Sequence, residues 1–180
     1  MNTHRQHERT VVDRATTLRV SEIYASVQGE STHAGKPCTF VRLTGCNLRC
    51  AWCDSPHTFT GGVHRVLGDV LDEVAALGLH TVEVTGGEPL VQNAAIPLLR
   101  ALVDAGHEVL LETSGSRSIA DVPPEVHVIL DLKCPGSGEV EANDWSNVAR
   151  LLPHHEVKLV VASRHEYVWA RDVIARHALH

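Results

Sequence analysis

Three cysteines that lie close together in the sequence are the residues most able to do chemistry. Cys46, Cys50 and Cys53 fall in one short run, Thr-Gly-Cys-Asn-Leu-Arg-Cys-Ala-Trp-Cys. Three thiolates can bind three irons of a cubic iron–sulfur cluster and leave the fourth iron open to another molecule. A redox pair needs only two of them, and a structural zinc ion normally takes four ligands, of which His33 or His57 could supply the last. The spacing favours a cluster, with zinc and a redox role as alternatives.

A second motif, Thr85-Gly86-Gly87-Glu88, follows the next β-rich run along the chain. Paired glycines allow a backbone to approach a ligand closely, and their N–H groups can bind a carboxylate. Glu88 can accept hydrogen bonds from an ammonium group. An ordinary glycine-rich turn is the alternative if this motif is taken alone.

Small hydroxyl groups and a lysine follow two further β-rich runs, in the segments 112–115 and 131–137. Ser114 and Lys133 are suited to contacts with a ribose and a carboxylate. Plain turns would explain either segment by itself. Their repeated position at strand ends favours a shared binding site.

Arg42 lies within an apolar run, where a guanidinium is costly to bury unless an anion pairs with it. The anion can be a substrate carboxylate or a carboxylate of the protein, and the sequence leaves both open. The run Ser-Val-Gln-Gly-Glu at 26–30 precedes this strand.

These motifs alternate with β-rich and helical segments. We expect strands at 18–24, 39–43, 81–85, 108–112, 126–131 and 157–161, and helices at 66–77, 97–103, 144–152 and 163–174. Regular alternation of strand and helix predicts an α/β fold with a parallel sheet and helices packed outside it. Ligands bind such sheets at the carboxyl ends of the strands, where all of these motifs lie.

The composition is that of one ordinary globular domain. The chain has 180 residues and a net charge of −6, which argues against general binding to nucleic acid or to a membrane surface. We expect a polar, frayed tail at 1–16 and a single domain at 17–180. No apolar stretch is long enough to span a bilayer, and the start shows no signal region, so we expect a cytoplasmic protein.

The five cysteines fit that compartment, because their number is odd and three of them crowd into one loop. Cys38 and Cys134 stand alone in the sequence. Small buried side chains are the expectation for both.

The cysteine loop, followed by Gly-Gly-Glu-Pro at the next strand, resembles the radical S-adenosylmethionine enzymes. In these enzymes the open iron binds the amino and carboxylate groups of S-adenosylmethionine, whose reductive cleavage gives a 5′-deoxyadenosyl radical. The runs at 26–31, 35–55, 85–90, 112–115 and 131–135 are together similar to the branch that converts a pterin to a deazapurine. This resemblance covers about residues 20–161.

The resemblance implies roles for particular residues. Cys46, Cys50 and Cys53 would bind a 4Fe–4S cluster, and Ser55 would bind Mg²⁺. The S-adenosylmethionine site would comprise Trp52, Cys53, Asp54, Gly86, Gly87, Glu88, Ser114, Lys133, Cys134 and Pro135. The substrate site would comprise Val27, Gln28, Gly29, Glu30, Arg42 and Thr85, with Arg42, Glu30 and Thr85 as the catalytic set.

The implied reaction is a ring contraction in queuosine and deazapurine biosynthesis. It takes 6-carboxy-5,6,7,8-tetrahydropterin to 7-carboxy-7-deazaguanine with loss of ammonia, and Arg42 would pair with the substrate carboxylate. Flavodoxin or ferredoxin would be the reductant, and the enzyme would be a homodimer. The alternatives are a glycyl-radical activase that acts on a partner protein and a non-catalytic metal-binding module.

One departure from the family concerns the end of the chain. Its members form a partial parallel (β/α) barrel of six core strands, whereas we count five here. We therefore expect a partial barrel that lacks the last strand, in a C-terminally truncated chain whose full activity is in doubt.

Overall fold

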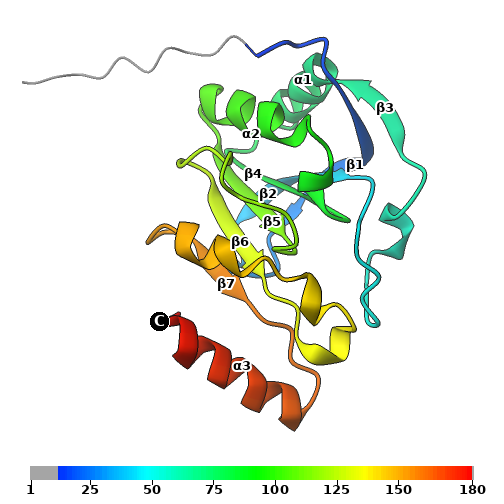
Figure 1. Cartoon of the computed structure of the whole chain (residues 1–180). Coiled ribbons are helices and arrows are strands. Elements are labelled where there is room, and N and C mark those ends of the chain that lie inside the picture. The colour runs from blue at the N-terminus through cyan, green and yellow to red at the C-terminus, as the bar shows by residue number, and fades with distance from the viewer. Residues whose placement is uncertain (1–11, 180) are drawn as a thin grey trace, which may run out of the picture.

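A computed structural model describes residues 12–179. Within them, one sheet of seven strands has the order β3-β1-β2-β4-β5-β6-β7. The strands are β1 (Thr17–Val27), β2 (Pro37–Leu43), β3 (Val63–Val66), β4 (Thr81–Gly86), β5 (Glu108–Thr113), β6 (His127–Asp131) and β7 (Glu156–Lys158). The helices are α1 (Leu67–Leu77), α2 (Ala95–Asp104) and α3 (Arg164–His177), arranged around this sheet (Figure 1).

Five neighbouring strands pair in parallel, as predicted, and form an open partial barrel: β2, β4, β5, β6 and β7. β1 is an exception, because it pairs antiparallel with both β2 and β3. The segment 28–36 that joins β1 to β2 is too short for the crossover that a parallel pair needs, so these strands form a hairpin. β3 was not predicted, because Val66 was assigned to the following helix.

The two faces of the parallel strands differ in chemistry, which is the pattern expected of strands with a period of two. One face carries apolar residues such as Val41, Val82 and Leu111, which join buried residues of α1 and α2 in the core. The other face carries Arg42, Glu83 and other polar residues that line a cavity. The apolar face, which is the outer one, therefore stabilises the fold. The polar face, which is the inner one, is left for binding.

Helix ends follow the sequence signals in part. α1 ends at Leu77, and the next residue, Gly78, adopts the left-handed conformation expected of a glycine C-cap. α2 begins at Ala95 rather than at Pro97. The helix expected at 144–152 is a 3-10 helix, Trp145–Arg150, whose N-cap Asp144 accepts a hydrogen bond from the N–H of Ser146.

The residues Ser163-Arg-His-Glu166 form a capping-box pattern, in which the first and last side chains each accept a backbone N–H, and only the first half of it is seen at the start of α3. Ser163 Oγ accepts a hydrogen bond from the Glu166 N–H at 3.2 Å. The Glu166 carboxylate instead accepts hydrogen bonds from the N–H groups of Gly136, at 3.1 Å, and Ala162, at 2.9 Å. Glu166 therefore ties α3 to the loop that follows β6.

The expected N-terminal tail covers residues 1–16, of which 1–11 lie outside the described residues. Residues 12–16 form a turn beside α1, where Arg14 donates hydrogen bonds to Gly68 O and to Asp72. No helix within 12–179 combines the length and the apolar character needed to cross a membrane.

Candidate active site

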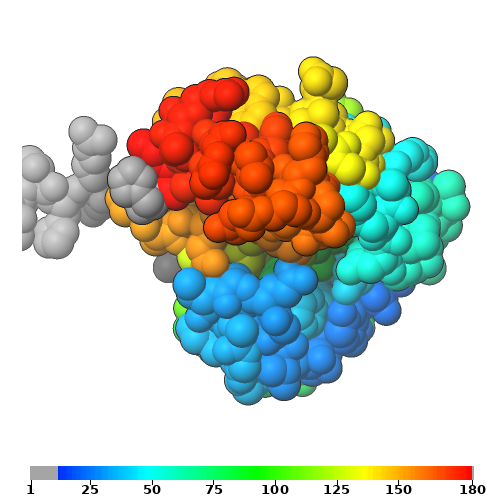
Figure 2. Space-filling view, turned by 90° about the horizontal axis from the view of Figure 1, so that it is seen from below, coloured from blue at the N-terminus to red at the C-terminus, as the bar shows by residue number. Residues whose placement is uncertain are grey.

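A cavity of about 450 Å³ lies against the inner face of the parallel strands and extends to their carboxyl ends. This volume is within the usual range for small-molecule sites. Figure 2 shows a cleft between the blue N-terminal residues and the orange and red C-terminal residues, with green atoms from the middle of the chain at its floor. Segments far apart in the sequence therefore face one another across it.

Most of the predicted site residues lie together in this cavity. Those that line it are Gln28, Gly29, Glu30, Arg42, Cys46, Cys50, Trp52, Cys53, Asp54, Ser55, Thr85, Gly86, Gly87, Ser114 and Lys133. Most of them belong to the parallel strands or to the loops at the carboxyl ends of these strands. Gln28, Gly29 and Glu30 instead follow β1, which is antiparallel, and so reach the cavity from the amino end of β2.

Four predicted contact residues do not line the cavity. Val27 is 57% exposed at the end of β1, and Cys134 is buried. Pro135 begins a short 3-10 helix beyond β6. Glu88 is fully buried behind the cavity wall. For these four, direct contact with a ligand stays a prediction, because motif position does not specify which way a side chain points.

The cysteine loop is held in place by the loops that follow β5 and β6. The Ala51 N–H donates to Ser137 O at 2.9 Å, and Asn47 Nδ2 donates to Ser116 Oγ at 3.1 Å. Arg49 stacks over the Phe59 ring at 4.2 Å. These contacts fix a loop that has no helix or strand of its own.

All three loop thiols are free and half-buried, and they face the same cavity. Burial raises the pKa of both Cys46 and Cys50, so metal binding must release their protons. Cys38 and Cys134 are buried elsewhere. Within the described residues the cavity thus offers three thiols, which matches a cluster with one open iron.

Gly86 and Gly87 allow two segments of the chain to pack closely, in addition to any contact they make with a ligand. At Gly86, with φ of +147°, an added Cβ would overlap Leu43 O of the neighbouring strand. At Gly87 it would overlap Gly45 O and lie 2.8 Å from Cys46 Cβ. Glycine is therefore required where the end of β4 meets the start of the cysteine loop.

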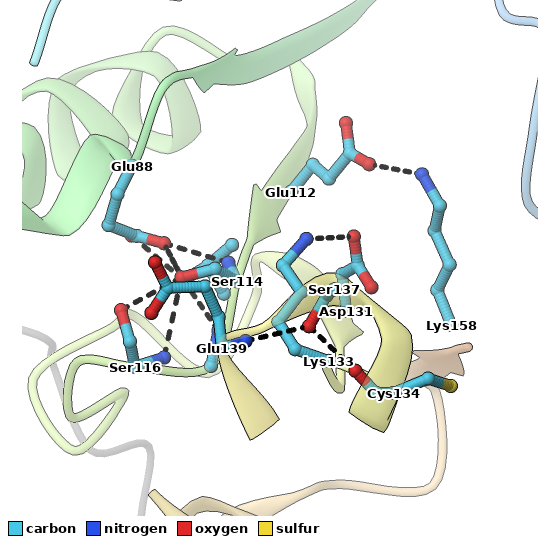
Figure 3. Close-up of polar contacts among 12 residues, drawn as sticks. Glu88, Glu112, Ser114, Ser116, Asp131, Lys133, Cys134, Ser137, Glu139 and Lys158 are labelled. Atoms are coloured by element: carbon cyan, nitrogen blue, oxygen red, sulfur yellow. Dashed lines mark hydrogen bonds and ion pairs between the residues drawn. The ribbon is translucent and has the colours of Figure 1, made fainter. Parts of the chain in front are cut away.

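Glu88 organises the end of β5 instead of facing a ligand. Its carboxylate accepts hydrogen bonds from Thr113 Oγ1 at 2.9 Å, from Ser114 N at 2.7 Å and from Leu90 N at 2.9 Å. Ser114 Oγ also donates to it (Figure 3). Glu88 thus positions Ser114, which lines the cavity.

Lys133 and Asp131 form an ion pair on the cavity wall. Lys133 Nζ donates to Asp131 Oδ2 at 2.6 Å (Figure 3). Burial disfavours the lysine charge, but the nearby Asp131 carboxylate outweighs it and raises the pKa of Lys133. Asp131 Oδ1 is buried without a hydrogen-bond partner in the described residues, so an acceptor remains available to a ligand.

Arg42 pairs with groups of the protein. Its Nε donates to Glu22 Oε1 at 2.8 Å, and Nη2 donates to the Tyr24 hydroxyl at 2.8 Å. Burial opposes its charge, but Tyr24 and Glu22 raise its pKa. These bonds use two of five N–H donors, so the guanidinium is fixed and can still bind an anion in the cavity.

Four charged residues of the cavity were given no site role from the sequence. They are Glu83 on β4, Glu112 on β5, Asp131 at the end of β6 and Lys158 on β7. Lys158 Nζ pairs with Glu112 Oε1 at 2.7 Å (Figure 3). It also pairs with Glu30, so residues far apart in the sequence meet across the cavity. The available signal was a charged residue at alternate positions of an otherwise apolar strand, as in Val82-Glu83-Val84.

Glu83 is enclosed most completely of these. Its side chain accepts a hydrogen bond from Gln28 Nε2. Burial, followed by the charge of Glu112, raises its pKa to about 8. Glu83 is therefore largely protonated at neutral pH, which keeps a buried acid uncharged.

The comparison with protein families agrees with this site. A family model described as the radical SAM superfamily matches residues 40–132, the segment that carries the cysteine loop and the glycine pair. The three-thiol cavity and this match together define the class of protein as a radical SAM enzyme.

Similar proteins identify the family within the radical SAM enzymes. The chain is 48% identical over 166 residues to a 7-carboxy-7-deazaguanine synthase of Koribacter versatilis, covering 90% of this chain and 73% of that protein. It is 44% identical to that of Chlorobaculum tepidum, covering 90% and 75%. The chain belongs to the 7-carboxy-7-deazaguanine synthase family.

A solved structure supports the fold. QueE from Escherichia coli superposes with a TM-score of 0.78 over 95% of this chain and 82% of that chain, at 23% sequence identity. The partial barrel is thus shared although most residues differ.

The cofactors of this family are a 4Fe–4S cluster, S-adenosylmethionine and Mg²⁺. The donor set fits them. Three free thiols suit the cluster, and the unpartnered Asp131 oxygen can accept a ligand N–H or O–H. Asp54 and Ser55 add oxygen donors to the same cavity, the type of ligand that Mg²⁺ prefers.

Proposed function

We propose that this protein converts 6-carboxy-5,6,7,8-tetrahydropterin to 7-carboxy-7-deazaguanine with loss of ammonia. The observation that carries the proposal is one cavity lined on one side by the cysteine loop and on the other by Arg42, Lys158 and Gln28. Named relatives at up to 48% identity support the choice of substrate. The chemistry of the polar wall supports it independently, as follows.

The substrate presents a carboxylate at one end and a face of N–H donors and a carbonyl acceptor at the other. Arg42 pairs with the carboxylate through its remaining N–H donors, held in orientation by Glu22 and Tyr24. Glu30, Gln28 and Thr85 bind the pyrimidine edge, since a carboxylate, an amide and a hydroxyl complement its donors and acceptor. Arg42, Glu30 and Thr85 thereby fix the ring against the inner face of the sheet.

The cofactors would bind at the opposite wall of the cavity, which carries the cysteine loop. Cys46, Cys50 and Cys53 would hold the cluster, and Ser55 would hold Mg²⁺. With one electron from a reductant, the bound cluster and S-adenosylmethionine would supply a primary carbon radical able to take a hydrogen atom from the substrate.

The residues of the S-adenosylmethionine subsite are Trp52, Asp54, Gly86, Gly87, Ser114 and Lys133. The Ser114 hydroxyl can donate a hydrogen bond to the ligand or accept one from it. Lys133 offers the ligand a positive charge, and Asp131 beside it offers a hydrogen-bond acceptor. Glu88 acts by positioning Ser114, because its own carboxylate is fully buried.

We propose three further features of the functional enzyme. Flavodoxin or ferredoxin supplies the electron that a radical SAM cluster requires. The enzyme is a homodimer, as the family resemblance suggests. It works in the cytoplasm, which agrees with five cysteines that form no disulfide in the structure.

Anaerobic turnover tests the reaction. Protein loaded with cluster is incubated with the pterin, S-adenosylmethionine, Mg²⁺ and a reductant, and the products are identified by mass. We expect 7-carboxy-7-deazaguanine, and none from a Cys50→Ala variant. Unchanged pterin, in a preparation that cleaves S-adenosylmethionine, would exclude the proposed substrate.

A further inference from the structure

A second group of potential metal ligands lies at the other end of the sheet. His127 is the first residue of β6, Glu156 is the first residue of β7, and His33 lies in the segment 28–36 between β1 and β2. One ligand atom from each of the three lies within 4.8 Å of the others. Because β6 and β7 run parallel, this group is at the amino ends of the strands, away from the cysteine loop.

His33 has a ring nitrogen with no protein partner. Its Nε2 is 3.2 Å from Glu108 Oε1, and an ionised carboxylate only accepts, so the proton is on Nε2. Nδ1 then carries a lone pair, and it is buried without a hydrogen-bond partner in the described residues. The side chain is only 9% exposed. A buried acceptor without a donor is costly, and a bound cation would satisfy it.

The other two groups are also held in orientation. Glu156 accepts hydrogen bonds from the Thr32 N–H at 3.1 Å and from Thr32 Oγ1 at 2.5 Å. His127 Nε2 lies 2.8 Å from Glu156 Oε1. Glu108 in turn accepts a hydrogen bond from Thr81 Oγ1 at 2.6 Å. The hydrogen bonds from Thr32 and Thr81 lie behind the potential ligands and orient them, as in protein metal sites. The contact between His127 and Glu156 joins two of the potential ligands, so an ion bound between them would replace it and release the proton that it holds.

We propose that His33, His127 and Glu156 bind a divalent transition-metal ion, for which Zn²⁺ is the best match. Two imidazoles and a carboxylate are a common ligand set for Zn²⁺, with water in the fourth position. Zinc bonds of roughly 2.0–2.2 Å place tetrahedral ligand atoms roughly 3.4 Å apart, so small side-chain movements suffice. The side chains of His127 and Glu156 are 15% and 22% exposed, which leaves a path of entry.

The ion would stabilise one wall of the active-site cavity. It would join the segment 28–36 to β6 and β7, and this segment begins with Gln28, Gly29 and Glu30, which line that cavity. Its role is therefore structural, and the inference does not depend on the proposed reaction.

Zinc content of the cluster-loaded, untagged protein tests the proposal. After equilibration with Zn²⁺ and removal of unbound metal, we expect about one zinc ion per chain in addition to the cluster iron. His127→Ala and Glu156→Gln should each weaken zinc binding by roughly tenfold or more and leave the iron content unchanged. His154→Ala, an exposed neighbour, is the matched control and should retain zinc.

X-ray absorption at the zinc edge separates this site from the cysteine loop. We expect only nitrogen and oxygen neighbours at about 2.0–2.1 Å, whereas zinc on the cysteines would show sulfur at about 2.3 Å. A sulfur shell, the absence of zinc from the wild type, or equal zinc in His127→Ala and His154→Ala would overturn the proposal. If His127→Ala also loses iron because it misfolds, the absorption spectrum of the wild type decides.

Discussion

Glu83 is an acid that the fold keeps protonated, and this has a measurable effect on stability. Its pKa rises from 4.5 to about 8, mainly through burial, so the folded protein holds a proton that the unfolded chain releases above a pH of about 4.5. The free energy of unfolding contributed by Glu83 therefore falls as the pH rises from about 4.5 to about 8.

Glu83→Gln removes this dependence, because the amide does not titrate. We expect the wild type to lose stability relative to the variant between those pH values, by at most roughly 5 kcal/mol at about 1.4 kcal/mol per pKa unit. Denaturant unfolding of both proteins across the range measures it. Parallel curves for the two proteins would show that Glu83 is not held protonated.

Arg42 supports a prediction about binding. Arg42→Ala should weaken pterin binding by about 10- to 100-fold, since a hydrogen-bonded ion pair contributes about 1.5–3 kcal/mol, and should change S-adenosylmethionine binding little. Equilibrium binding to cluster-loaded protein measures both. Arg100→Ala, on α2 and outside the cavity, is the control, and equal losses for both ligands would count against the role of Arg42.

At the level of elements, Gly87 joins the end of β4 to the cysteine loop. A Cβ there would lie 2.8 Å from Cys46 Cβ and would overlap Gly45 O, so Gly87→Ala must displace the loop. We expect fewer irons per chain and a destabilisation of roughly 1–3 kcal/mol. Gly29→Ala is the matched control, because it also lines the cavity but has no atom within 4 Å of its added Cβ. Full iron content in Gly87→Ala would refute this.

The parallel strands could be predicted from the sequence because each is a short apolar run bounded by turn residues. β3 could not, because Val63–Val66 joins α1 without a break and is a strand only through its pairing with β1. The antiparallel direction of β1 likewise depends on a partner. Local sequence thus predicts which segments extend, while pairing partners come from the tertiary structure.

The same limit applies to the site at the level of the whole molecule. The cysteine loop and the strand-end motifs were found because their residues are close in sequence. The pairing of Lys158 with Glu30 and Glu112 spans most of the chain, and no spacing indicates it. Glu88 shows the opposite case, in which a motif was recognised but its side chain points into the protein.

The whole cavity, from Gln28 to Val160, joins the cysteine loop to a wall that complements a carboxylated pterin. Family membership favours this use over a glycyl-radical activase or a non-catalytic metal-binding module. The proposed reaction requires that the pterin held by one wall react with the cofactors held by the other.

The most direct test of that claim follows ammonia and 7-carboxy-7-deazaguanine together during anaerobic turnover of 6-carboxy-5,6,7,8-tetrahydropterin by the cluster-loaded chain. The proposed ring contraction predicts that both products form in equal amounts. Cleavage of S-adenosylmethionine by an intact cluster, with neither product formed, would contradict it.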